Sequence, residues 1–207
     1  MSINPPIQQR RQRWQRQGGV FAVEFAMLAL LFFLFLFAML EVARAVYVWN
    51  MVHEITRRAA RAAAVTDFSN AGALQAVRTH AVLRATPGTL PLGGGIGDAH
   101  VRIDYLSESA GGAAPVAVPV TVMPACPQRN RINCLDDPHG ASCIRFVRAR
   151  LCQPGVGARC EGLPYRPVLP LLGMMFPSGA AAIRLPSGTT MAVAESLGYP
   201  DNPGFCP

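Results

Sequence analysis

The chain has 207 residues, 51% of them hydrophobic, and a formal net charge of +7. This length is enough for one membrane segment and one modest domain. All 19 basic residues are arginines, but they are scattered and accompany no nucleic-acid-binding motif, so we expect no nucleic-acid partner.

Residues 1–19 form a polar, basic leader ahead of a long apolar run. Residues 1–17 contain Pro5-Pro6 and many glutamines and arginines, a composition that predicts a short disordered segment. Positive residues beside a membrane helix stay on the cytoplasmic side, so we expect the leader in the cytoplasm and everything after the apolar run outside it. The arginines of the leader are Arg10, Arg11, Arg13 and Arg16.

The run from Val20 to Leu40 is almost entirely apolar, and its only charged residue is Glu24. As a helix it spans roughly 30 Å, which is the thickness of the hydrocarbon core of a bilayer. We therefore expect residues 20–42 to cross the lipid bilayer once. A carboxylate inside a bilayer costs roughly 3 kcal/mol or more, so Glu24 either reaches back to the headgroups or has a partner.

The helical pattern continues beyond the apolar run to about residue 66. Asn50–Val65 is rich in alanine and arginine and contains no glycine or proline, which favours a helix. A single helix of this length reaches roughly 70 Å, so its outer half must pack on a domain or on neighbouring subunits. We interpret Arg57, Arg58 and Arg61 as a solvated face; the alternative is contact with acidic groups on adjacent subunits.

Residues 67–207 are expected to form an extracytoplasmic α+β domain. Good N-cap residues precede a predicted helix at Ala71–Ala85, and Pro87-Gly88 ends it. Further along, apolar and polar residues alternate as they do in half-buried strands. The predicted strands are 101–106, 116–122 and 143–152, and 181–195 reads as a hairpin. The predicted fold class is thus α+β: a long N-terminal transmembrane helix, a short helix and a small antiparallel sheet with disulfides.

The six cysteines all lie in the distal part of the chain, from residue 126 onward. An even number in an exported region predicts disulfides, and the 15 possible pairings remain open. Metal binding is disfavoured, because no two cysteines have C-x-x-C spacing and the histidines are dispersed. The ends of a continuous strand 143–152 would lie about 30 Å apart, which excludes a bond between Cys143 and Cys152. The disulfide candidates are Cys126, Cys134, Cys143, Cys152, Cys160 and Cys206.

Enzymatic motifs are absent from the sequence. It contains no G-x-S-x-G, no H-E-x-x-H, no P-loop and no pair of carboxylates in a plausible site. We interpret Asp136, Asp137 and His139 as turn residues rather than as metal ligands. The sequence therefore predicts a protein that is not an enzyme and that has no cofactor.

The junction between the leader and the apolar run resembles the prepilin signal of type IV pilins and pseudopilins. It has a basic leader, Gly19 before the apolar helix, and Glu24 five residues later. The resemblance implies that a prepilin peptidase cuts between Gly19 and Val20. It also implies that Glu24, with Phe25 beside it, takes part in assembly by pairing with the new α-amino group of a neighbouring subunit.

The resemblance is closer to the TadE-like minor pseudopilins of the tight-adherence (Flp) pilus. Its motifs are GGVFAVEFAMLALLF at Gly18–Phe32 and an E-x-x-R-A-x-Y pattern, and the predicted hairpin ending at Glu195 resembles the end of that family. Phe25 stands where the major Flp pilin has tyrosine, and the chain is much longer, which favours a minor component. The pattern residues are Glu41, Arg44, Ala45 and Tyr47.

The TadE-like resemblance implies a place and a set of partners. The place is the inner membrane, with the N-terminus in the cytoplasm and the C-terminal domain in the periplasm, or the pilus itself. The implied partners are the prepilin peptidase, other pilins and pseudopilins of the same pilus, and the inner-membrane assembly platform. The implied role is pilus biogenesis and surface adhesion.

Two alternatives remain. Ala43-Arg44-Ala45 loosely fits the A-x-A rule of signal peptidase, which would make the chain a Sec-exported binding protein. An uncleaved helix would make it a single-pass anchored protein with a disulfide-bonded binding domain. The mature N-terminus separates the three hypotheses: Val20 for the pseudopilin, Val46 for the exported protein, and Met1 or Ser2 for the anchored one.

Overall fold

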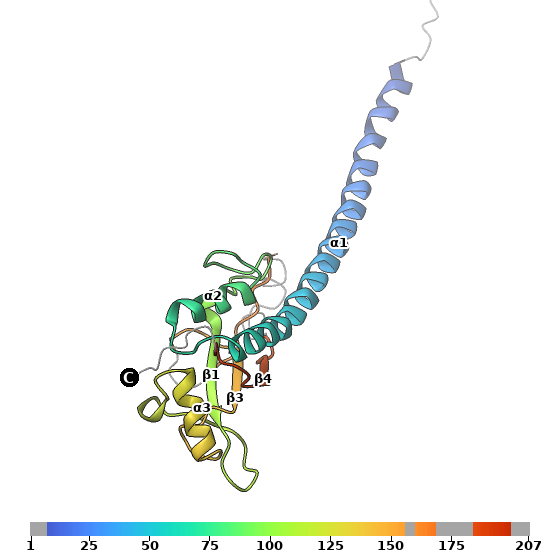
Figure 1. Cartoon of the computed structure of the whole chain (residues 1–207). Helices are drawn as coiled ribbons and strands as arrows, with labels where there is room; N and C mark the ends of the chain where they lie inside the picture. The colour runs from blue at the N-terminus through green and yellow to red at the C-terminus, as the bar shows by residue number, and fades with distance from the viewer. Residues whose placement is uncertain (1–7, 156–159, 169–183, 200–207) are drawn as a thin grey trace, which may run out of the picture. The chain divides into compact units, whose positions relative to one another are not determined.

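The computed structural model describes residues 8–155, 160–168 and 184–199, and Figure 1 shows the whole chain. The chain divides into two compact units, Met1–Arg44 and Ala45–Pro207, which we describe one at a time. The predicted fold class is confirmed: a long apolar N-terminal helix, shorter helices and a four-stranded antiparallel sheet with disulfides.

The first unit is the N-terminal part of helix α1, which spans Gln8–Ala64. The helix begins inside the leader, so the expectation of disorder over residues 1–17 is wrong from Gln8 onward. Residues 8–17 are glutamines, arginines and one tryptophan, without proline or glycine, and most of these are good helix formers. Pro5-Pro6 precede the first described turn of the helix, and residues 1–7 lie outside the described residues.

The second unit starts with the rest of α1, whose end at Ala64 agrees with the predicted end near residue 66. Helix α2 spans Ala71–Ala81, and the Asn70 side chain caps it by accepting a hydrogen bond from the Ala73 N–H at 3.0 Å. The helix stops before the predicted Ala85, because the chain turns at Leu83, which has a φ of 61°.

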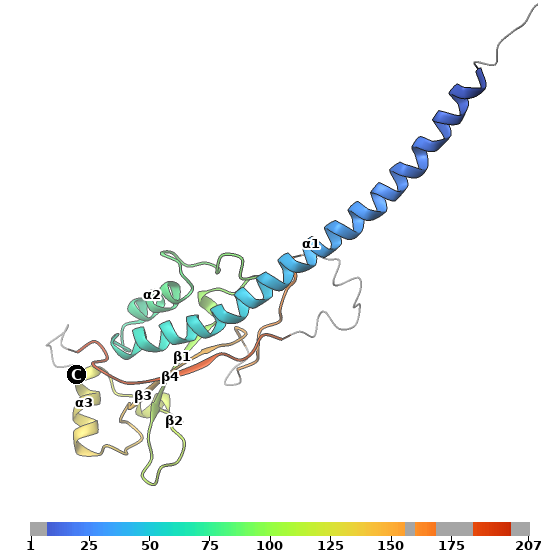
Figure 2. The same cartoon turned by 90° about the vertical axis from the view of Figure 1, so that its right-hand side faces the viewer.

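The four strands of the sheet lie in the order β2-β1-β3-β4, and all neighbours are antiparallel. Figure 2 shows the sheet below the second half of α1 and α2. Short 3₁₀ segments stand at Asp98–His100 and Val120–Val122. The strands are β1 Val101–Ser107, β2 Val116–Ala117, β3 Phe146–Leu151 and β4 Thr189–Val193.

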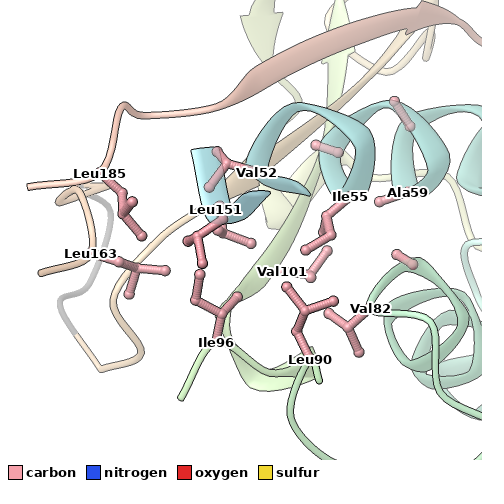
Figure 3. Close-up of a cluster of buried hydrophobic side chains, with 14 residues drawn as sticks. Val52, Ile55, Ala59, Val82, Leu90, Ile96, Val101, Leu151, Leu163 and Leu185 are labelled. Atoms are coloured by element: carbon pink, nitrogen blue, oxygen red, sulfur yellow. The ribbon is translucent and has the colours of Figure 1, made fainter. Parts of the chain in front are cut away.

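The second half of α1 packs on the sheet and supplies one side of the hydrophobic core (Figure 3). Val52 and Ile55 are fully buried, and Ala59 lets the helix come close to its neighbours. This confirms that the outer part of the helix packs on a domain. A second cluster contains Phe68, from the turn between α1 and α2, and Tyr105 on β1, whose ring centroids lie 5.5 Å apart.

The strand predictions hold best for β1, which spans Val101–Ser107 against a predicted 101–106. The core face of β3 carries the predicted Val147, Ala149 and Leu151, all buried, although the strand is shorter than 143–152. The predicted strand 116–122 is reduced to β2, because Pro119 has no N–H to donate and the chain turns into a 3₁₀ segment.

The predicted hairpin at 181–195 is wrong in the described residues. Strand β4 pairs with β3, and Arg184 instead forms an isolated bridge with Pro164. Residues 181–183 lie outside the described residues. Helix α3, Pro127–Asp136, was not predicted, because its polar sequence has little apolar periodicity.

Two disulfides join segments close in sequence. Cys134 bonds to Cys143 and Cys152 bonds to Cys160, with Cα atoms 4.8 and 4.9 Å apart. The predicted absence of a Cys143–Cys152 bond is therefore confirmed. Cys126 is also disulfide-bonded, and Cys206 lies outside the described residues.

Candidate functional site

The apolar segment of α1 exposes its side chains on every side. Phe21 is 74% exposed and Phe25 is 67% exposed, and the side chains as far as Leu40 are exposed in the same way, with Ala29 half-buried. Within the described residues, α1 is the one helix long and apolar enough to cross a membrane, and none of its apolar window is buried. Each large side chain left in water forgoes about 1.5–3 kcal/mol, so this surface requires lipid or other helices around it.

Aromatic rings make this surface bulky and continuous. The ring centroids of Phe32 and Phe33 lie 5.6 Å apart in an edge-on arrangement, and those of Phe33 and Phe37 lie 6.1 Å apart and stacked. A helix that is apolar all round is either buried in protein or surrounded by lipid. The segment is therefore suited to both environments and to passage between them.

Glu24 stands alone in this apolar segment. Its side chain is exposed, and it makes no ion pair or hydrogen bond within the described part of the chain. The predicted cleavage positions Gly19 and Val20 lie on the same helix, in the turn before it. The described residues thus offer no partner for the charge of Glu24.

The residues of the E-x-x-R-A-x-Y pattern make contacts inside the chain. The Arg44 guanidinium lies 3.1 Å from a carboxylate oxygen of Glu41, as expected for residues three apart on a helix. The Tyr47 hydroxyl donates a hydrogen bond to the carbonyl oxygen of Pro91 at 3.2 Å. These residues thus contribute to the fold of the chain itself.

The arginines in the outer part of α1 face away from the core. Glu54 accepts hydrogen bonds from the Nε atoms of Arg58 at 2.6 Å and Arg57 at 3.0 Å, and these bonds, Arg58 first, lower the pKa of Glu54. Arg61 is exposed. This part of the helix is a solvated face in the described chain, as the sequence predicts.

A second charged cluster lies on the sheet face that α1 does not cover. One oxygen of Asp104 on β1 accepts bonds from Arg150 at 2.6 Å and Arg148 at 3.3 Å, and Arg102 reaches the other oxygen at 3.1 Å. Burial alone would raise the pKa of Asp104, but the hydrogen bonds and positive charges of Arg150 and Arg102 outweigh it and hold the pKa below its ordinary value. Strand alternation predicts the arginine face but does not identify Asp104, which comes from a non-adjacent segment.

The acidic residues near α3 have a structural role. Asp137 ends the helix, and its carboxylate accepts a hydrogen bond from the His139 N–H at 3.0 Å, as the turn interpretation predicts. In the described residues no group of three or more His, Cys, Asp or Glu side chains is placed to hold a metal ion.

An exposed apolar helix joined to a disulfide-bonded α+β unit defines a class of proteins anchored or assembled through an N-terminal helix. A comparison with protein families is more specific: residues 19–61 match the model of the TadE-like protein family. This match confirms the resemblance found in the sequence and supports a protein associated with the tight-adherence pilus. No match was found among curated proteins or among solved structures.

The matched segment begins at Gly19 and ends at Arg61. It contains Glu24 and the outer part of α1 that packs on the sheet. The sheet, α2, α3 and the disulfides lie beyond it. The family match therefore concerns the helix, and the distal domain has to be understood from its own structure.

Proposed function

We propose that this protein is a minor pseudopilin of a tight-adherence pilus, processed by a prepilin peptidase between Gly19 and Val20. The observation that carries the proposal is Glu24: a carboxylate without a partner among the described residues, on an exposed apolar helix, five residues after the glycine where the family match begins. The proposed organisation is a leader at 1–19, a helix at 20–66 and an extracytoplasmic domain at 67–207.

Cleavage would supply the missing partner. The cut creates a positively charged α-amino group at Val20, and in a neighbouring copy or pilin this group can approach Glu24. Two opposite charges that leave water together offset part of each other's desolvation cost, whereas a single charge does not. The pair of the Val20 α-amino group and Glu24 would also fix the position of one helix along the axis of its neighbour, because only one such position brings the two charges together.

Cleavage also changes how firmly the chain is held in the membrane. The leader carries four arginines, and each of them opposes movement of the helix into or across the bilayer. Without the leader, the helix starts with Val20 and an apolar surface on all sides. Phe25 and its neighbours can then exchange lipid contacts for contacts with other pilin helices during pilus assembly.

The disulfides agree with a domain outside the cytoplasm. Cys134–Cys143 and Cys152–Cys160 are both formed, and such bonds persist in oxidising compartments such as the periplasm. An inner-membrane protein with its N-terminus in the cytoplasm satisfies both this requirement and the charge of the leader.

The proposal is tested by the N-terminus of the mature protein, purified from the native host and measured by intact mass and Edman sequencing. We expect Val20 in the wild type and an uncut chain in the Gly19→Leu variant. A mature chain beginning at Val46 would support Sec export instead, and one beginning at Met1 or Ser2 would support a plain membrane anchor.

The role of Glu24 needs a separate measurement. The Glu24→Gln variant keeps the size and shape of the side chain but removes its charge, so it should still be cut after Gly19. We expect it to fail in assembly, seen as loss of co-purification with the other pilus subunits. Normal assembly of this variant would contradict the charge-pairing mechanism while leaving the cleavage result standing.

A further inference from the structure

Strand β4 is one of the two edge strands of the sheet, with β2 at the other edge, and it lies on the right in Figure 1. The Leu151 N–H donates to the Gly188 carbonyl at 3.2 Å, and the Ala194 N–H donates to the Arg145 carbonyl at 2.8 Å. These two bonds fix the phase of the β3–β4 ladder, because bonded residues alternate along an antiparallel pair. The backbone groups that point away from β3 are therefore those of Thr189, Met191 and Val193.

This outer row of backbone groups has no hydrogen-bond partner among the described residues. In Figure 2 the β4 edge of the sheet faces the viewer. Native edges are usually protected by lysine, proline, a bulge or a covering loop. Strand β4, with the sequence TTMAV, has no charge and no proline, and Met191 and Val193 are 49% and 63% exposed. Among the described residues no strand pairs with this edge, which therefore offers a template for another strand.

We propose that β4 pairs antiparallel with β4 of a second copy of this chain, about a two-fold axis through Met191. Thr189 and Val193 each lie two residues from Met191. In this register, each residue whose backbone groups point away from β3 therefore lies opposite a residue of the same kind in the second copy. Thr189 then faces Val193 of the second copy, and Met191 faces its own equivalent. A shift by one residue would set outward groups opposite inward ones and leave them unbonded.

The side chains and charges also permit this pairing. Thr189 with Val193 and methionine with methionine are uncharged cross-strand pairs. On β3, the strand beside β4, the charged side chains of this face are Arg148 and Arg150, and Asp104 binds both. Glu195 follows β4, two residues beyond Val193. Between the two copies the β3 strands would lie three strand spacings apart, about 14 Å, which is beyond the Debye length of roughly 8 Å at physiological salt. The β3 arginines of the two copies thus add little charge repulsion at this edge.

The pairing is tested by charge exchange at Met191 in the full chain, purified in detergent micelles and measured by light scattering during size-exclusion chromatography. We expect a concentration-dependent dimer for the wild type. The Met191→Lys variant places two positive charges opposite each other and should raise the dissociation constant at least tenfold, and Met191→Glu should do the same with negative charges. An equimolar mixture of the two variants should recover the dimer, since lysine then faces glutamate.

Val120→Lys is the matched control, because Val120 is an apolar residue that is 89% exposed and lies outside β4. It should leave the dimer unchanged, and circular dichroism should show all variants folded.

A monomeric wild type overturns the proposal, as does a dimer that Met191→Lys leaves intact, which would point to contacts through the apolar helix. If the wild type is monomeric and Met191→Lys instead weakens binding to another pilus subunit, the strand that pairs with β4 belongs to a different protein. Failure here leaves cleavage at Gly19 untouched, since that is measured by the mature N-terminus.

Discussion

The hydroxyl oxygens of Thr56 on α1 and Thr190 on β4 lie 3.0 Å apart. The Thr56 oxygen also lies within hydrogen-bond distance of the carbonyl oxygens of Val52 and His53. Since a hydroxyl has one proton, Thr56 donates to the backbone of its own helix and accepts the proton of Thr190. The helix and the strand are thus joined by a polar contact, which requires that they approach closely.

Gly188 permits this approach, and replacing it should loosen the domain. A Cβ atom at Gly188 would lie 2.5 Å from Cγ1 of Val52 and 3.1 Å from its carbonyl oxygen. The Gly188→Ala variant should therefore lose about 1–3 kcal/mol of unfolding free energy, measured by urea denaturation. Gly72→Ala is the control: Gly72 lies in the exposed first turn of α2, where alanine should stabilise by roughly 0.5–1 kcal/mol. Equal effects at the two glycines would contradict this account.

The ion cluster around Asp104 should give the domain an acid-sensitive stability. Its folded pKa lies below the ordinary value, so the stabilisation is fully present above the unfolded pKa, near 3.8, and is lost as the pH falls through the folded pKa. Asp104→Asn removes the charge that Arg148 and Arg150 share and should cost about 1–3 kcal/mol at neutral pH. Urea denaturation between pH 7 and pH 2.5 measures both effects.

The pH dependence of the stability difference distinguishes loss of the Asp104 charge from a general loss of packing. The difference in stability between wild type and Asp104→Asn should be constant above pH 5 and should shrink below pH 4, because the wild type then loses the same charge. A difference that stays constant through the acid range would show that the variant acts through packing alone.

The disulfide between Cys152 and Cys160 should stabilise the end of β3. Their sequence separation is 8, and closing a loop of that length removes unfolded-state entropy worth about 2–3 kcal/mol. The double variant Cys152→Ser with Cys160→Ser should lose about this amount in thermal unfolding. Mass spectrometry after alkylation without reductant should show Cys134 and Cys143 still unmodified in this variant, because their bond does not involve Cys152 or Cys160. A free thiol at either position would mean that the pairings exchange.

Local sequence patterns predict a helix or strand when the pattern lies within the element itself, as a continuous apolar run or a regular alternation does. The apolar run identifies α1, and strict alternation identifies the buried face of β3. The pairing of β4 with β3 could not be foreseen, because alternation shows that a segment is a strand but not which strand lies beside it. Helix α3 was missed because its polar residues show little apolar periodicity, although proline at its first turn is a common helix start.

In the candidate site, too, the sequence predicts relationships between residues close in the chain but not contacts between distant ones. Gly19 and Glu24 are recognisable because their spacing along one helix carries the signal. Asp104 was not recognised as the partner of Arg150, since 46 residues separate them and only the register of the sheet brings them together.

Replacing Tyr105 with phenylalanine should not destabilise the domain and can raise its stability. Its hydroxyl is buried and has no hydrogen-bond partner among the described residues, and this burial raises the pKa of Tyr105 above its ordinary value. A buried hydroxyl without a partner loses its water contacts and gains nothing, so Tyr105→Phe should be neutral or stabilise by up to about 1 kcal/mol. Tyr47→Phe is the control, since it removes the bond to the Pro91 carbonyl and should cost about 0.5–1.5 kcal/mol. Thermal unfolding of the two variants side by side should show opposite shifts, and destabilisation by Tyr105→Phe would mean that its hydroxyl has a partner after all.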